Sequence, residues 1–339
     1  MATKTAAQEP TVIDNTAYLE RLKARTDDPS MRRAITSFAT AYLNGGNNIY
    51  RLGLELNVKD LTRCQWKHEV NKANGEKYGY KLDSTKRGNN TDEVIYFEKF
   101  YAYVVDMSDK LIEFVGVKSD KPGEKPLPMT LGDTVLNPYD RLGIIYNQDG
   151  TKGADYDLYN QLFQEYPGRF TSRRFLMIML ADAEGNTLHD IPVMLSLKGG
   201  ALRYFDEALL NAQSRLGMVE SSLIGTQDAS PLSIKALRGY LLGFQCAKGD
   251  SSNGTMSSPV TAIESIGAEI TTDNAHEYFS IEKEELLTGW SLANPDFLAA
   301  YDRQVSNAIG TKIRASLEAA NDPDQFVLPE ATATFSEVA

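Results

Sequence analysis

The stretch RRFLMIMLADAEGNTLHDIPVMLSLKGGALRYFDEALLN, residues 173–211, decides the fold that the sequence predicts. Residues 175–181 are an unbroken apolar run, short enough for a strand that is covered on both faces. The turn residues 182–186 follow, and residues 191–197 return as a second apolar strand. Gly199 and Gly200 end that strand, and residues 201–211 carry apolar residues at helical spacing. We therefore expect a β-hairpin that runs directly into a helix.

The segments on either side of this stretch predict a mixture of helices and strands. Apolar periodicity and caps favour helices over residues 14–25, 30–43, 155–166, 281–290 and 295–320. Alternation and turn residues favour a hairpin of strands 65–70 and 77–82, a loop over 84–92 and a long strand over 94–105. The pattern predicts an α+β protein with a mostly antiparallel central sheet or OB-like barrel, flanked by N-terminal and C-terminal helices.

Composition shifts divide the chain into four expected parts. They are an N-terminal arm with helices over 1–62, a β-rich core domain with inserted helices over 63–270, a C-terminal helical region over 271–320 and an acidic flexible tail over 321–339. The length of 339 residues suits about two domains or one large one.

The composition is that of an ordinary globular protein, with 42% hydrophobic and 24% charged residues. The first ten residues lack the apolar core of a signal peptide, and no apolar stretch is long enough to span a membrane. Cys64 and Cys246 are far apart in the sequence and predict no disulfide framework. We therefore expect a cytoplasmic protein with no membrane association.

The net charge of −11 is distributed unevenly. Residues 264–339 hold 4 basic and 14 acidic residues, so the rest of the chain is about neutral. Residues 63–87 hold 7 basic and 3 acidic residues. Such asymmetry indicates either a polyanion partner for the basic part or an acidic face that keeps the protein soluble.

The residue types of catalytic and metal sites are scarce. Cys64 and His68, four residues apart, are the one candidate pair for a thiolate and an imidazole, but no third group that would orient them is identifiable. His189 and His276 are isolated, and the histidines and cysteines lack zinc-site spacing. We expect no metal and no cofactor, and an enzyme is the least favoured class.

Lys198-Gly199-Gly200 lies between an expected strand and an expected helix. A glycine pair there lets backbone amides approach an anion at the helix N-terminus. It is neither a P-loop nor a dinucleotide fingerprint, and a tight strand-to-helix turn is the favoured interpretation.

Aromatic residues interleaved with cations are typical of strands that bind single-stranded nucleic acid. The expected hairpin over 65–82 has this pattern, and further basic residues follow it and precede the 175–181 strand. The candidate nucleic-acid-binding residues are Trp66, Lys67, Lys72, Lys77, Tyr78, Tyr80, Lys81, Arg87, Arg173, Arg174 and Lys198.

A β-rich core followed by an acidic tail resembles single-stranded-DNA-binding proteins in architecture and charge, without a shared motif. The tail here lacks the terminal aromatic residue that such tails often carry. The resemblance implies a non-catalytic protein that binds single-stranded DNA or RNA and assists replication or recombination. The alternative is a structural or assembly protein of a phage or a multimeric complex. Protein partners bound through the acidic tail, and self-association into an oligomer, fit either class.

Overall fold

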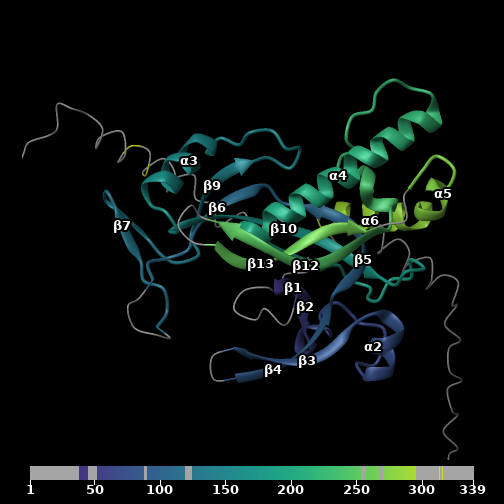
Figure 1. Cartoon of the computed structure of the whole chain (residues 1–339), viewed down its shortest axis with the longest axis horizontal. Helices are drawn as coiled ribbons and strands as arrows, with labels where there is room; N and C mark the ends of the chain where they lie inside the picture. The colour runs from purple at the N-terminus through teal and green to yellow at the C-terminus, as the bar shows by residue number, and fades with distance from the viewer. Residues whose placement is uncertain are drawn as a thin grey trace, which may run out of the picture.

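A computed structural model describes residues 38–44, 52–87, 90–118, 124–252, 257–266, 270–294, 313 and 315. Within these ranges the chain is α+β, built on an 11-stranded, mostly antiparallel sheet, which confirms the predicted class (Figure 1). The strands are β1 (Thr40–Asn44), β2 (Gly53–Asn57), β3 (Lys81–Arg87), β4 (Asn90–Phe97), β5 (Lys99–Met107), β6 (Lys110–Phe114), β7 (Met129–Leu131), β8 (Thr134–Leu136), β9 (Arg141–Tyr146), β10 (Phe170–Ala181), β11 (Val193–Lys198), β12 (Leu242–Ser252) and β13 (Ser257–Ile266). The helices are α2 (Lys72–Tyr78), α3 (Tyr156–Glu165), α4 (Gly199–Ile224), α5 (Ala275–Tyr278) and α6 (Ile281–Ala293), with 3-10 turns η2 (Val58–Asp60) and η3 (Ala236–Gly239).

The strand order of the main sheet is β13-β12-β5-β10-β11-β1-β2-β4-β3. In addition, β6 pairs with the first part of β10 and with β9, while β7 and β8 form a separate hairpin. The β1–β11 pair is parallel, and the other described pairs are antiparallel. Because β1 and β2 belong to this sheet, the sheet begins before residue 63 in the sequence.

Strand β10 is the centre of the fold, since it pairs with β5, β6 and β11. Its alternate residues enter two different hydrophobic clusters. Leu176, Ile178 and Leu180 pack in the cluster that α4 covers, and Met177 and Met179 pack in the cluster that α6 covers. The apolar run therefore forms a strand that is buried on both faces, as the sequence predicts.

Helix α4 lies across one face of the sheet, over β10 and β12 (Figure 1). It begins at Gly199, whose φ of +55° is a conformation that glycine adopts without strain. Leu202, Phe205 and Leu209 form part of its buried stripe. The helix continues well past the expected end at residue 211, and at Gly217 it passes so close to Ser230 that a Cβ would lie 2.1 Å from the Ser230 carbonyl oxygen.

The sheet curves around the cluster under α4. Leu54 of β2, Phe97 of β4 and Phe244 of β12 are buried in the same cluster as Ile178 of β10, although these strands are widely separated in the strand order. The Cys246 thiol of β12 also makes a hydrogen bond with the backbone of Leu54. A third cluster joins α3, β6 and β9, and it includes Ile313, which the sequence placed on the apolar stripe of the expected helix over 295–320.

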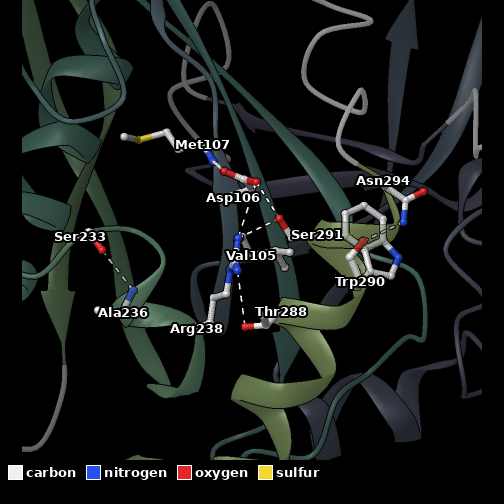
Figure 2. Close-up of polar contacts among 10 residues, drawn as sticks. All are labelled: Val105, Asp106, Met107, Ser233, Ala236, Arg238, Thr288, Trp290, Ser291 and Asn294. Carbon is white, nitrogen blue, oxygen red and sulfur yellow. Dashed lines mark hydrogen bonds and ion pairs between the residues drawn. The ribbon is translucent and has the colours of Figure 1, made fainter. Parts of the chain in front are cut away.

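A buried arginine ties η3 to the opposite face of the sheet. Figure 2 shows Arg238 donating to the Val105 carbonyl oxygen at 2.8 Å and to the Ser291 hydroxyl at 2.8 Å. Ser291 in turn donates to Asp106 at 2.9 Å, and the Arg238 guanidinium lies 3.7 Å from the same carboxylate. Because each buried polar group has a partner, this cluster fastens α6 to β5 and is structural.

The expected hairpin over residues 65–82 is wrong, because its centre is helix α2. The Asn71 side chain accepts from the Asn74 amide at 2.9 Å and caps the helix, and Gly79 ends it with a φ of +80°. These two local signals override the alternation of aromatic and basic residues. Lys72, Lys77 and Tyr78 therefore belong to a helix, and only residues 81 and 82 belong to a strand.

Three neighbouring predictions also differ from the structure. Residues 40–44 form β1, so the described end of the expected helix over 30–43 is a strand. Residues 84–87 and 90–92 of the expected loop over 84–92 belong to β3 and β4, which pair with each other, and the expected long strand over 94–105 is interrupted at Glu98. The expected helix over 14–25 and the tail over 321–339 lie outside the described residues.

Candidate nucleic-acid interface

A hollow of about 660 Å³ lies where α2 meets the turn between β10 and β11. It brings together three of the candidate residues, Lys67, Lys77 and Tyr78. The other residues that line it are His68, Asp182, Glu184, Asn186, Thr187 and Lys283. The lining holds three lysines and two carboxylates.

The wall of the hollow contains a pair of parallel aromatic rings. The His68 and Tyr78 ring centroids are 4.1 Å apart with 14° between the planes, and both residues are half-buried. The Lys77 ammonium lies 4.9 Å from the Tyr78 centroid, within reach of a cation–π interaction. Burial, aided by the charges of Lys77 and Lys67, lowers the pKa of His68, so its imidazole is neutral at pH 7.

The chain before α2 is anchored to the β10–β11 turn. The Lys67 amide donates to the Leu188 carbonyl oxygen at 3.0 Å, and Trp66 forms an isolated bridge with His189. The Lys67 ammonium donates to the Thr187 hydroxyl at 2.6 Å and lies 3.0 Å from an Asp190 carboxylate oxygen. These contacts fix Lys67 at one wall of the hollow, while α2 carries Lys77 at another.

The two carboxylates of the hollow differ in their surroundings. Asp182 accepts from the amides of Glu184 and Asn186 at 3.1 and 2.8 Å, and from the Asn186 side chain at 3.1 Å. Its charge is therefore largely satisfied by its own turn. Glu184 is exposed on the same turn. Lys283, from the start of α6, reaches the hollow and lies 3.8 Å from Glu282.

Trp66 and Tyr80 do not present their rings to the hollow. Tyr80 is buried, and it meets Trp66 edge to face with centroids 6.1 Å apart. The other side of Trp66 stacks on the buried His189 at 6.0 Å. Both aromatic rings are therefore part of the support beneath the hollow rather than of its surface.

The other basic residues of the 63–87 region whose side chains the structure describes are not among the residues that line the hollow. Lys72 is exposed on α2 with its ammonium 3.9 Å from Glu76. Lys81 on the edge strand β3 donates to Glu98 at 2.7 Å and lies over the Tyr96 ring. Arg87 belongs to β3, and its side chain is outside the described part of the structure.

Arg173, Arg174 and Lys198 form a second basic group at the far end of β10 and β11. Arg173 holds Glu113 with two hydrogen bonds, the longer of them 2.7 Å, and also donates to Ser196. Arg174 donates to Asp206 at 3.0 Å. Lys198 is exposed at the N-cap of α4, where the glycine pair makes the expected tight strand-to-helix turn.

Cys64 and His68 do not form a catalytic pair. Burial raises the pKa of the Cys64 thiol to about 12, and its Sγ donates to the Leu61 carbonyl oxygen at 3.2 Å. The thiol is therefore protonated at pH 7 and is not a nucleophile. His68 instead stacks on Tyr78, a role that the sequence pattern did not indicate.

The turn residues Asp182, Glu184, Asn186 and Thr187, together with Lys283, are members of the hollow that sequence reasoning missed. They are more than 100 residues from Lys67 in the sequence, and no local pattern connects them. The one signal in the sequence was the expected β-hairpin over 175–197. Its turn was expected to lie beside another segment, but the sequence did not indicate which one.

Within the described ranges, no three histidine, cysteine, aspartate or glutamate side chains are grouped closely enough to hold a metal ion. None of the described helices is both long and apolar enough to cross a membrane. Comparison of the chain with protein-family models, with curated proteins and with solved structures gives no match.

Proposed function

We propose that the chain is a non-catalytic protein that binds single-stranded nucleic acid at the hollow beside α2. The observation that carries this proposal is the parallel His68–Tyr78 pair with Lys67 and Lys77 beside it. An aromatic surface beside ammonium groups suits a strand that offers flat bases and phosphates together, and such stacking tolerates any base.

The proposal favours single strands over duplexes for a geometric reason. The aromatic pair lines a hollow rather than projecting from the surface, so a base has to leave a stack to reach it. A flexible single strand does this at lower cost than a paired duplex. We also propose that the curved sheet is OB-like, that the protein is cytoplasmic, and that it assists replication or recombination.

Fluorescence anisotropy with a labelled oligothymidylate of about 20 nucleotides tests the proposal. We expect binding at low salt that weakens as salt rises, because phosphate contacts release counterions. Lys67→Gln and Lys77→Gln should each weaken binding severalfold and reduce the salt slope by about 1. Tyr78→Ala should cost about 1 to 3 kcal/mol of binding free energy, as loss of a stacked base does.

Lys152→Gln is the matched control. Lys152 also lies over a tyrosine ring, 4.2 Å from the Tyr156 centroid, but it is not part of the hollow. Its substitution removes the same charge from the same kind of local contact and should leave binding unchanged. Absence of binding by the wild type at low salt, or equal losses in Lys77→Gln and Lys152→Gln, would refute the proposal.

An assembly protein is the second candidate, and exposed apolar residues on α4 and α6 favour it. They are Leu210, Met218, Leu223, Ile224, Ile281, Leu286 and Leu292. Side chains of this size on two helices suit contacts with another copy or another protein. A mass measurement in solution over a range of concentrations decides between a monomer and an oligomer.

A further inference from the structure

A second cavity, of about 790 Å³, lies beside α4. The end of β5, the start of β6, the loop after β9, α4 and residues 231–235 all contribute to its lining. It shares no lining residue with the hollow beside α2. Its volume is in the range of about 300 to 1,000 Å³ that small-molecule sites occupy.

One wall of this cavity has two cations on one carboxylate. Asp206 of α4 accepts from the Lys110 ammonium at 3.1 Å and from the Arg174 guanidinium at 3.0 Å. The Arg174 side chain is only 8% exposed, and its Nε has no hydrogen-bond partner among the described residues. The group of Lys110, Arg174 and Asp206 therefore keeps one positive charge that Asp206 does not neutralise.

The other carboxylates that line the cavity are held by different groups. Asp106 accepts from Ser291 at 2.9 Å and lies 3.7 Å from Arg238 (Figure 2). Asp149 accepts from the Thr151 amide at 2.9 Å and from the Thr151 hydroxyl at 2.6 Å. Neither carboxylate forms one of the described ion pairs with the two cations of that wall, and a third cation, Lys235, also lines the cavity.

A further carboxylate near Arg174 is Asp109, which does not line the cavity. It accepts from the Gln148 amide at 2.9 Å, and burial raises its pKa. It interacts electrostatically with Arg174 but forms none of the described ion pairs with it, and the described ion pair of the guanidinium is with Asp206.

Apolar side chains also line the cavity. Met107, Leu209 and Leu232 line it, and Leu210 lines it while remaining 54% exposed. The segment that carries Leu232 is held against α4 by the Gln213 side chain, which donates to the Leu232 carbonyl oxygen at 2.7 Å. The lining thus combines apolar side chains with cationic ones.

We propose that this cavity binds a small amphipathic organic anion, a carboxylate on an apolar body. The carboxylate lies against Lys110 and Arg174, where charge-assisted hydrogen bonds are strongest, and the apolar body lies along Leu209 and Leu232. An uncharged molecule of the same shape gives Lys110 and Arg174 no anionic partner. A short hydrophilic anion leaves Leu209 and Leu232 in contact with water. Both groups of the ligand are therefore required.

Isothermal titration calorimetry of the full chain with octanoate tests this site, with 1-octanol as the uncharged probe of the same length. We expect octanoate to bind and octanol to bind at least about tenfold more weakly. Lys110→Gln removes a cation from the wall and should weaken octanoate binding about tenfold. Leu210→Glu, at an exposed position, places a negative charge at the cavity without disturbing the core and should weaken it by a similar factor.

Met218→Glu is the matched control, because Met218 is on the same helix, is also 54% exposed and does not line the cavity. It should bind octanoate as the wild type does. No binding of octanoate by the wild type, equal affinity for octanol, or an equal loss in Met218→Glu overturns the proposal. Because the two sites share no residue, oligothymidylate binding and octanoate binding can fail independently.

Discussion

The two groups of basic residues in this chain have opposite surroundings. Arg173 and Arg174 on β10 are turned toward carboxylates that come from elsewhere, Glu113 at 60 residues' distance and Asp206 at 32. Lys77 has an aromatic ring as its described neighbour and opens on a hollow. A count of charges treats both groups alike, and what separates Arg173 from Lys77 is whether the fold supplies a buried carboxylate. Arg173, paired with the buried Glu113, stabilises the sheet, whereas Lys77 lies over the Tyr78 ring and forms none of the described ion pairs.

Loss of the Glu113 carboxylate should have the largest effect. Glu113 is buried and its side chain is 2% exposed, so Glu113→Ala leaves the Arg173 guanidinium largely buried without its counter-ion. We expect a loss of about 3 to 5 kcal/mol in the free energy of unfolding, measured by urea denaturation. Glu76→Ala, which removes an exposed partner of Lys72, is the control and should change stability by less than about 1 kcal/mol. Similar losses in the two variants would show that the Arg173–Glu113 pair is not a buried structural pair.

The free energy of unfolding should decrease in mild acid, because of His189, which packs beneath the hollow. His189 is fully buried, accepts from the Leu180 amide at 2.9 Å, and has its pKa lowered by burial to about 4. The unfolded chain binds this proton near pH 6.5 and the folded chain does not, so stability falls as pH decreases from about 6.5 to 4, by at most about 3 kcal/mol.

Urea denaturation at pH 7 and pH 5 measures this effect. His189→Gln should lose less stability between the two pH values than the wild type, and His276→Gln, at an exposed position, should follow the wild type. An equal pH dependence in His189→Gln and the wild type would contradict the assignment of the effect to His189.

Lys77→Gln should have the smallest effect on stability. Lys77 is exposed on a short helix, so we expect the free energy of unfolding to change by less than about 0.5 kcal/mol, as with Lys152→Gln. Thermal unfolding of the two variants beside the wild type checks this. A loss as large as that of Glu113→Ala would place Lys77 among the structural residues and remove the contrast with Arg173.

The predictions from the sequence are correct where the pattern that specifies an element lies within a single segment. The hairpin and helix over 173–211, the helix over 155–166 and the helix over 281–290 were all predicted, because an apolar run of strand length or a helical stripe is readable locally. The prediction failed at residues 65–82, where Asn71 and Gly79 form a short helix inside an alternating pattern. Short elements offer too few residues for a period to be distinguished.

The candidate site was predicted only in part, for a related reason. Lys67, Lys77 and Tyr78 were chosen from a pattern of basic and aromatic residues, and the structure brings these three together. Trp66 and Tyr80 belong to the same pattern but pack inward, because Tyr80 meets the core at Phe97. Which side of a segment faces solvent depends on what packs against it, and that information is not local.

By itself, the sequence determined that this chain has a strand covered on both faces, a hairpin that leads into an amphipathic helix, and a basic segment after residue 62. Each of these follows from the chemistry of neighbouring residues. Only the tertiary structure decided that Arg173 meets Glu113, that Lys67 meets Thr187, and that Lys110 and Arg174 share Asp206. These contacts join residues between 32 and 120 positions apart, and the contacts and the burial of each partner exist only once the sheet has formed.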